Sequence, residues 1–140
     1  MIAIRTHRLL PLAAAAGALL VAGGAAHATP SGTVTVRLGG GDSVSANRAC
    51  GEGGRFTNYR KGDRVYFAGS VTPAPPAGTK IAIKVRICLD GKWEFAREQT
   101  ATSRPNGSFR GSFEVKEPSK CFVRASYKSS RSPKVYFHVR

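Results

Sequence analysis

Four residues in this sequence could do chemistry through a thiol or an imidazole: Cys50, Cys88, Cys121 and His138. Three thiolates and one imidazole can hold zinc in a tetrahedral site. A thiol beside an imidazole can act as an activated nucleophile, and two thiols can close a disulfide. Each of these outcomes requires the residues to meet, so it depends on the elements that position them.

The N-terminal segment is predicted to be a signal peptide rather than part of the fold. Arg5 and Arg8 precede an apolar stretch at residues 9–22, and Ala-His-Ala at 26–28 is typical of a cleavage site. The alternative is a membrane anchor, but the stretch is short for a bilayer-spanning helix and contains a proline. We therefore expect residues 1–28 to be removed and the protein to be secreted or associated with a cell wall, without stable membrane insertion.

The 112 residues that remain (140 − 28) are enough for one domain with one core. The removed segment holds two arginines and no acid, so the net charge falls from +14 to +12 (14 − 2). Such a field favours an anionic polymer or an acidic protein as partner. The alternative, that the domain is simply basic, as many exported domains are, stays open.

The clearest structural pattern is the alternation of residues 80–89. Ile81, Ile83 and Val85 fall on one face with Ile87 and Leu89, and Lys80, Ala82, Lys84, Arg86 and Cys88 fall on the other. This period of two predicts a strand. Asp90-Gly91 predicts a type I′ hairpin turn into a strand over about 92–102.

Weaker alternation predicts further strands over 33–38, 64–71, 108–115, 121–128 and 134–140. Residues 29–58 are interpreted as an N-terminal strand followed by a glycine-rich loop with at most a short edge strand, and residues 59–140 as the core of the domain. The proline-rich segment 72–78 predicts a stiff connection between two sheets. Gly69, on the inner face, predicts close packing against the opposite sheet.

About seven strands without a helix predict an all-β, antiparallel sandwich. The succession GDRVYFAGSVTP, GTKIAIKV, DGKWEF, NGSFRGSF, RASY and SPKVYFHV resembles the immunoglobulin-like modules of bacterial exported and wall-associated proteins, over residues 59–140. The resemblance implies a spacer, binding or adhesion role and supplies no catalytic residue to transfer.

In an immunoglobulin-type topology the three cysteines and His138 converge at one end of the domain. Strand adjacency favours a Cys88–Cys121 disulfide, while Cys50–Cys88 stays open because Cys88 faces outward and Cys121 inward. The third thiol could be reactive or could link a dimer. The absence of a Cys-x-x-Cys motif disfavours zinc. A Cys50/His138 or Cys121/His138 pair lacks an orienting residue, so we expect neither an enzyme nor a cofactor.

The third, sixth and seventh predicted strands should be neighbours, and their outward residues form a basic face. Its members are Lys84, Arg86, Phe122, Arg124, Lys128, Lys134, Tyr136, His138 and Arg140. The cations can pair with phosphates or carboxylates, and Phe122 and Tyr136 can stack on sugars or bases. The alternative is a solvated sheet face. A membrane-active role is disfavoured because no amphipathic helix is predicted. The sequence thus predicts a secreted, non-catalytic binding or structural module for an anionic polymer.

Overall fold

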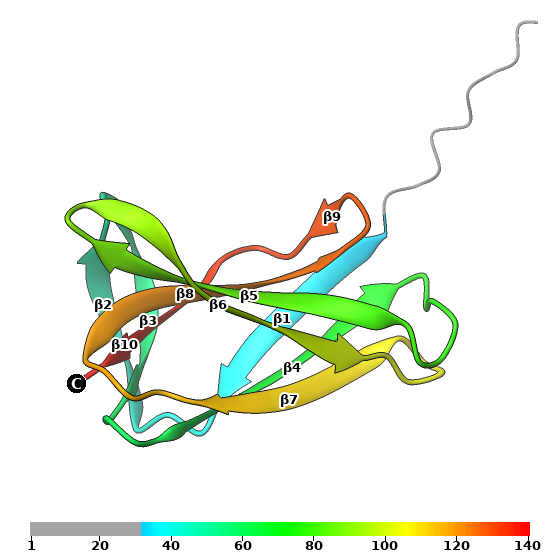
Figure 1. The fold of residues 1–140 in the computed structure, drawn as a ribbon, viewed down its shortest axis with the longest axis horizontal. Helices are drawn as coiled ribbons and strands as arrows, with labels where there is room; N and C mark the ends of the chain where they lie inside the picture. Colours follow the sequence, from blue (N-terminus) through cyan, green and yellow to red (C-terminus); the bar gives the residue numbers. More distant parts are fainter. Residues whose placement is uncertain (1–31) are drawn as a thin grey trace, which may run out of the picture.

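The computed structural model describes residues 32–140, which form ten strands and no helix (Figure 1). The strands are β1 (Thr33–Gly39), β2 (Ser43–Ala49), β3 (Glu52–Tyr59), β4 (Arg64–Thr72), β5 (Lys80–Leu89), β6 (Lys92–Thr102), β7 (Ser108–Glu114), β8 (Ser119–Tyr127), β9 (Ser130–Arg131) and β10 (Val135–Val139). The predicted signal peptide, residues 1–28, lies outside the described residues. Nowhere in residues 32–140 is there a helix long and apolar enough to cross a membrane.

The strands form two sheets. One is three-stranded, in the order β1-β4-β7, and the other is seven-stranded, in the order β2-β3-β10-β8-β5-β6 with β9 beside β8. Neighbouring strands are antiparallel except β3 and β10, which are parallel. The predicted all-β class is confirmed, with ten strands in place of about seven. The predicted third, sixth and seventh strands correspond to β5, β8 and β10, which are neighbours.

The inner faces of both sheets contribute to one hydrophobic core. From the seven-stranded sheet, the alternation of β5 buries Ile81 and Ile83 completely. From the three-stranded sheet, Phe67 and Phe109 enter the same cluster. Burial of each such side chain contributes about 1.5–3 kcal/mol, so the hydrophobic core accounts for why these two sheets stay together.

Residues 43–59 form a β-hairpin, and the expectation of a glycine-rich loop here is wrong. Cys50 and Gly51, with φ of 49° and 78°, make the connection between β2 and β3. Asp90 and Gly91, with φ of 48° and 76°, make the same kind of turn between β5 and β6, as predicted. Two positive φ values are the mark of a type I′ turn. The β2–β3 hairpin escaped prediction because β2 is exposed along nearly all its length and carries small or polar residues instead of an apolar alternation.

The proline-rich segment leads from β4 in one sheet to β5 in the other, as predicted. Its course is fixed by a side chain from the end of β6. The Ser103 hydroxyl donates to the carbonyl oxygen of Pro76 at 3.0 Å and accepts from the backbone N–H of Thr79 at 3.2 Å. A segment that has lost N–H donors to proline is thus held by this side chain together with the backbone hydrogen bonds of Gly78 and Thr79 to Ser103.

Gly69 is crowded, but not by the opposite sheet. A Cβ added there would overlap the carbonyl oxygen of Thr35 in β1 and the ring of Phe109 in β7, the two strands that flank β4. The Phe109 ring covers the inner surface that Gly69 leaves bare. The predicted packing against the opposite sheet is therefore corrected to packing within the three-stranded sheet.

Gly69→Ala should lower the free energy of unfolding by about 1–3 kcal/mol, because a backbone carbonyl and an aromatic ring must both move. Gly39→Ala is the control, since its added Cβ meets no atom within 4 Å. It should change stability by no more than about 0.5 kcal/mol. Urea unfolding measures both, and equal losses for the two variants would contradict the crowding at Gly69.

Candidate functional site

A disulfide between Cys50 and Cys88 ties two hairpins together. Their Cα atoms are 5.7 Å apart, and 38 residues separate them in sequence. Cys50 is in the tip of the β2–β3 hairpin and Cys88 is near the end of β5, while β10 and β8 lie between β3 and β5 in the sheet. The hairpin therefore bends over the outer face of the seven-stranded sheet, where it runs at a steep angle to β5 and β6 (Figure 1).

The favoured Cys88–Cys121 pairing is wrong because the two thiols lie on opposite faces of the sheet. Cys121 pairs in register with Ile87, one residue before Cys88, and faces the core. Its side chain is free and its residue is only 4 % exposed. Burial raises the pKa of Cys121 to about 11, against a smaller opposing effect of the Ser119 hydroxyl at 3.3 Å. The thiol is thus protonated at neutral pH and too buried to link a dimer.

His138 does not meet a thiol either. It lies opposite Lys120 of β8 on the outer face, whereas its neighbour Phe137 pairs with Cys121. Burial, followed by the charges of Lys120 and Arg140, lowers the pKa of His138. Two thiols are consumed by the disulfide and the third is on the other face, so neither the zinc ligand set nor a Cys/His pair assembles. Residues 32–140 hold no group of three or more His, Cys, Asp or Glu placed to bind a metal.

Peptide mapping of the secreted protein should find Cys50 joined to Cys88 and Cys121 unpaired. Iodoacetamide should label Cys121 only after unfolding, because its thiol is buried and protonated in the native state. Unfolding at pH 7 without reductant supplies the positive control for labelling. Rapid native labelling, or a Cys88–Cys121 peptide, would contradict this arrangement.

Four aromatic rings fill the space beneath the bent hairpin: Phe56, Trp93, Phe122 and Tyr136. We call them the aromatic cluster. Phe56 and Tyr136 stack with centroids 5.0 Å apart, and Trp93 meets Phe122 edge-on at 4.8 Å. Phe56 is completely buried and Phe122 is 7 % exposed. Aromatic pairs of this geometry add about 0.5–1.5 kcal/mol beyond their buried area, so the outer face has a small hydrophobic nucleus of its own.

Glu52 closes this nucleus from the hairpin side. Lys134 Nζ donates to its Oε1 at 2.6 Å, and the Tyr136 hydroxyl donates to its Oε2. These two hydrogen bonds, the one from Lys134 first, lower the pKa of Glu52. The indole N–H of Trp93, buried without a hydrogen bond of normal geometry, adds a smaller lowering. Burial, then the bond to Glu52, raises the pKa of Tyr136 to about 12.

Part of the predicted basic face therefore serves the fold. Phe122 is buried in the aromatic cluster, and Tyr136 is stacked on Phe56 and bonded to Glu52, so neither ring presents a free face for stacking. Lys134 is paired with Glu52 and lies 4.8 Å from the Phe122 centroid. The physical cause is the bent hairpin, which covers this end of the sheet.

Five further cations of the predicted face stay partly or fully open. We call the three that lie within β5 and β8 the basic ridge: Lys84, Arg86 and Arg124. Lys84 is directly opposite Arg124, and Arg86 lies opposite Phe122. None of them makes an ion pair; among the described residues the ion pairs are Arg60–Asp42 and Lys134–Glu52. Glu98 is the cross-strand neighbour of Lys84 but lies outside ion-pair distance.

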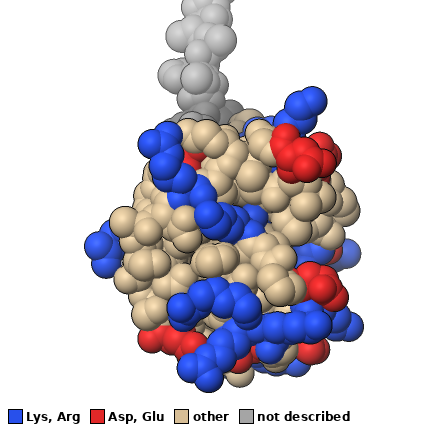
Figure 2. All heavy atoms as spheres, turned by 90° about the vertical axis from the view of Figure 1, so that its left-hand side faces the viewer, with Lys and Arg blue, Asp and Glu red and all other residues tan. Residues whose placement is uncertain are grey.

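The remaining members of the predicted face flank the ridge. Lys128 follows the end of β8 and Arg140 follows the end of β10, and both are exposed. Lysines and arginines are spread over the end of the molecule where β2, β3 and the C-terminus lie, with smaller acidic groups among them (Figure 2). Positive charge is therefore not confined to the ridge.

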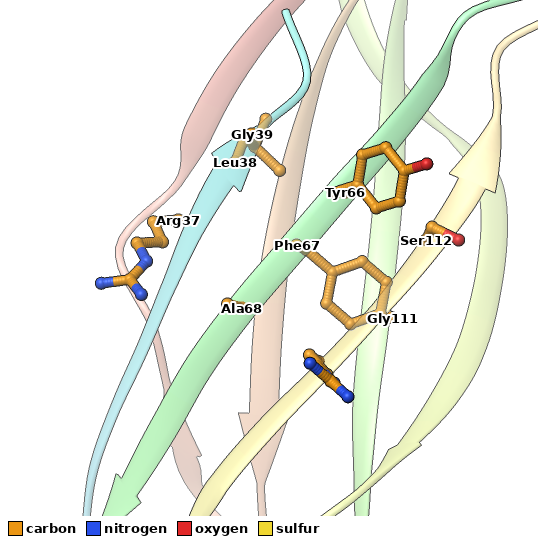
Figure 3. A pocket seen from close by; sticks show the side chains of 9 residues that line it. Arg37, Leu38, Gly39, Tyr66, Phe67, Ala68, Gly111 and Ser112 are labelled. Atoms are coloured by element: carbon orange, nitrogen blue, oxygen red, sulfur yellow. The ribbon is translucent and has the colours of Figure 1, made fainter.

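A second surface feature was missed by the sequence analysis. Two depressions, of about 540 and about 640 Å³, adjoin on the outer face of the three-stranded sheet and share Arg37, Ala68 and Arg110. Figure 3 shows the first of them. The residues of both depressions come from short separate runs in β1, β4 and β7, with Arg104 from the turn before β7, so no local motif marks them. Only the register of the sheet reveals that the two arginines flank one alanine.

Glu52→Gln should reduce stability at neutral pH and lose its effect in acid. Because the folded pKa of Glu52 lies below the unfolded value of about 4.3, its stabilisation is present above that value and is lost as pH falls through the folded pKa. The difference in free energy of unfolding from the wild type should be largest at about pH 6 and should shrink as the pH falls below the unfolded value. Glu117→Gln, in an exposed turn, is the control; a pH-independent difference for Glu52→Gln contradicts the prediction.

Comparison with solved structures gives a weak likeness. No family model and no curated protein matches the chain. Among solved structures, it is similar to the alkylpurine DNA glycosylase AlkC of Pseudomonas fluorescens, bound to DNA containing an abasic site analogue, at a TM-score of 0.42 and 12% identity. The match covers 76% of this chain and 30% of that one, so the chain spans less than a third of that protein. A likeness at this level carries no function across.

Proposed function

We propose that the protein is an exported, non-catalytic, immunoglobulin-like module that binds an anionic polymer through its basic ridge. The observation that supports this most directly is that Lys84 and Arg124 lie opposite each other on adjacent strands. Neither side chain forms an ion pair. Like charges directly opposite one another destabilise a sheet. A phosphate or carboxylate between the two side chains would remove that cost, and Arg86, two residues along β5, extends the positive row.

The surroundings of Arg124 support the proposal. Its guanidinium carbon lies 5.8 Å from the Phe122 centroid, so the aromatic cluster holds this side chain from below. Its Nε is buried without a hydrogen-bond partner. A guanidinium held in this way loses less side-chain entropy on binding, and its planar fork suits a carboxylate or phosphate.

Sheet order supports the immunoglobulin-like part of the proposal. The order β1-β4-β7 is that of strands A, B and E, and β10-β8-β5-β6 is that of G, F, C and C′. The disulfide departs from the family pattern, because it joins the β2–β3 tip to β5 while Cys121 of β8 has no partner in β4. A disulfide of this kind suits an oxidising compartment outside the cytosol, in keeping with export.

Replacing both opposed cations, as Lys84→Gln with Arg124→Gln, should weaken binding to long-chain polyphosphate or polygalacturonate by roughly tenfold at low salt. The slope of log affinity against log salt should fall by about two, one for each lost contact. Lys61→Gln with Lys116→Gln is the charge-matched control, since both lysines are exposed in turns away from the ridge.

Fluorescence titration at several salt concentrations measures these affinities, and comparison of the two polymers separates phosphate from carboxylate preference. Equal weakening by the ridge variant and the control would show that net charge alone drives binding. Affinity that does not respond to salt would overturn the proposal.

A further inference from the structure

We propose that the outer face of the three-stranded sheet holds a second binding site, which takes a segment of an acidic polysaccharide. We call it the β4 groove: the two adjoining depressions that share Arg37, Ala68 and Arg110. The proposal that the groove binds a polymer depends only on the geometry of the groove. The further proposal that one module bridges two polymer segments rests also on the proposed function of the basic ridge.

The register of the sheet creates the groove. Arg37 of β1 and Arg110 of β7 both pair with Ala68 of β4, so two long cationic side chains flank a methyl group. Two strand spacings put their Cα atoms about 10 Å apart. Farther along β4, Ser70 is paired with Ser108 and donates or accepts a 3.0 Å hydrogen bond with Thr35, so the floor continues with small hydroxyl side chains.

Tyr66 forms the wall at one end of the groove. It is 53 % exposed, an unusual placement for a large ring on a polar face. Gly40, with φ of +81°, leaves room for it, since a Cβ there would lie 2.8 Å from the ring. Figure 3 shows Tyr66 and Ser112 at this end and Arg37 to the other side of Ala68.

The charge of the groove selects an anion. No residue that lines either depression is acidic. Arg37 and Arg110 are exposed, and within residues 32–140 neither makes an ion pair or a side-chain hydrogen bond. The acid of this face, Glu114, lies opposite Arg64 at the end of the sheet, and Arg64 also donates to Ser112 Oγ at 3.0 Å. Arg37 and Arg110 are thus available to an anion, and so is Arg104, an exposed residue of the second depression that also makes no ion pair.

A sugar chain fits better than a polyanion without rings. Arginine forks pair with carboxylates, the hydroxyls of the floor can exchange hydrogen bonds with sugar hydroxyls, and the amphipathic Tyr66 ring offers an apolar face with a polar tip. Inorganic polyphosphate could use the arginines alone.

Because the two sheets share one core, the β4 groove and the basic ridge face away from each other. A polymer segment in one cannot touch the other without passing around an edge. One protein molecule therefore holds two segments and can bridge two chains.

The test uses oligogalacturonates for stoichiometry by calorimetry and long polygalacturonate for light scattering. The wild type should bind two oligomers and raise scattering at intermediate protein-to-polymer ratios, with loss of scattering at excess protein. Arg37→Gln with Arg110→Gln should bind one oligomer and lose the scattering peak while staying on the polymer. Tyr66→Ala should weaken oligogalacturonate binding several-fold and leave polyphosphate binding unchanged.

The outcomes separate the two proposals. One oligomer per wild-type molecule that is lost only in the ridge variant overturns the groove and keeps the ridge. Two oligomers that are unaffected by the ridge variant keep the groove and overturn the proposed function. If Lys61→Gln with Lys116→Gln lowers scattering as much as the groove variant, charge neutralisation explains it and the bridging proposal falls.

Discussion

The bond between Cys50 and Cys88 is the constraint on which the outer face of the seven-stranded sheet depends. In the β2–β3 hairpin, β2 is nearly all exposed and the large buried side chains come from β3, where Phe56 and Tyr59 are completely buried. The position of the hairpin is set by the parallel pairing of β3 with β10 and by the disulfide. Closing a loop of 38 residues restricts the unfolded chain by about 4 kcal/mol on the loop-entropy account, a substantial share of the stability of a domain this size. The aromatic cluster and the Glu52 carboxylate then fill the space between the hairpin and the sheet, which the disulfide holds together.

The position of the hairpin gives two cations of the same face different roles. Lys134 and Arg124 both lie near the Phe122 ring, at 4.8 and 5.8 Å. Lys134 meets a carboxylate brought by the hairpin and becomes part of the fold. Arg124 meets another cation, Lys84, and keeps its charge uncompensated. The difference arises from one acidic residue, Glu52, that the hairpin delivers to one side of the cluster only.

The sequence predicts what depends on local pattern. The alternation of β5 and the Asp90-Gly91 turn follow from period and turn chemistry. The adjacency of β5, β8 and β10 is a non-local feature, which is expected from the resemblance to an immunoglobulin-type topology. The β2–β3 hairpin could not be predicted in the same way, because its turn begins with a cysteine at positive φ where asparagine or glycine is the usual signal. The burial of Phe122 depends on that hairpin, so it could not be predicted either. Side-chain parity did carry the right signal for the disulfide, since it placed Cys88 and Cys121 on opposite faces.

The two cationic surfaces can coexist because they are separated by more than the range of their fields. Two packed sheets lie about 10 Å apart, and side chains on both outer faces bring the separation of the charges to about 20 Å. The Debye length at physiological ionic strength is about 8 Å, so charges at this distance are largely screened through the surrounding solvent. An anion bound at the basic ridge would therefore leave the potential at Arg37 and Arg110 nearly unchanged. A sandwich with its cations on one face could hold a polymer, but only two electrostatically independent faces would let a second segment bind as readily as the first.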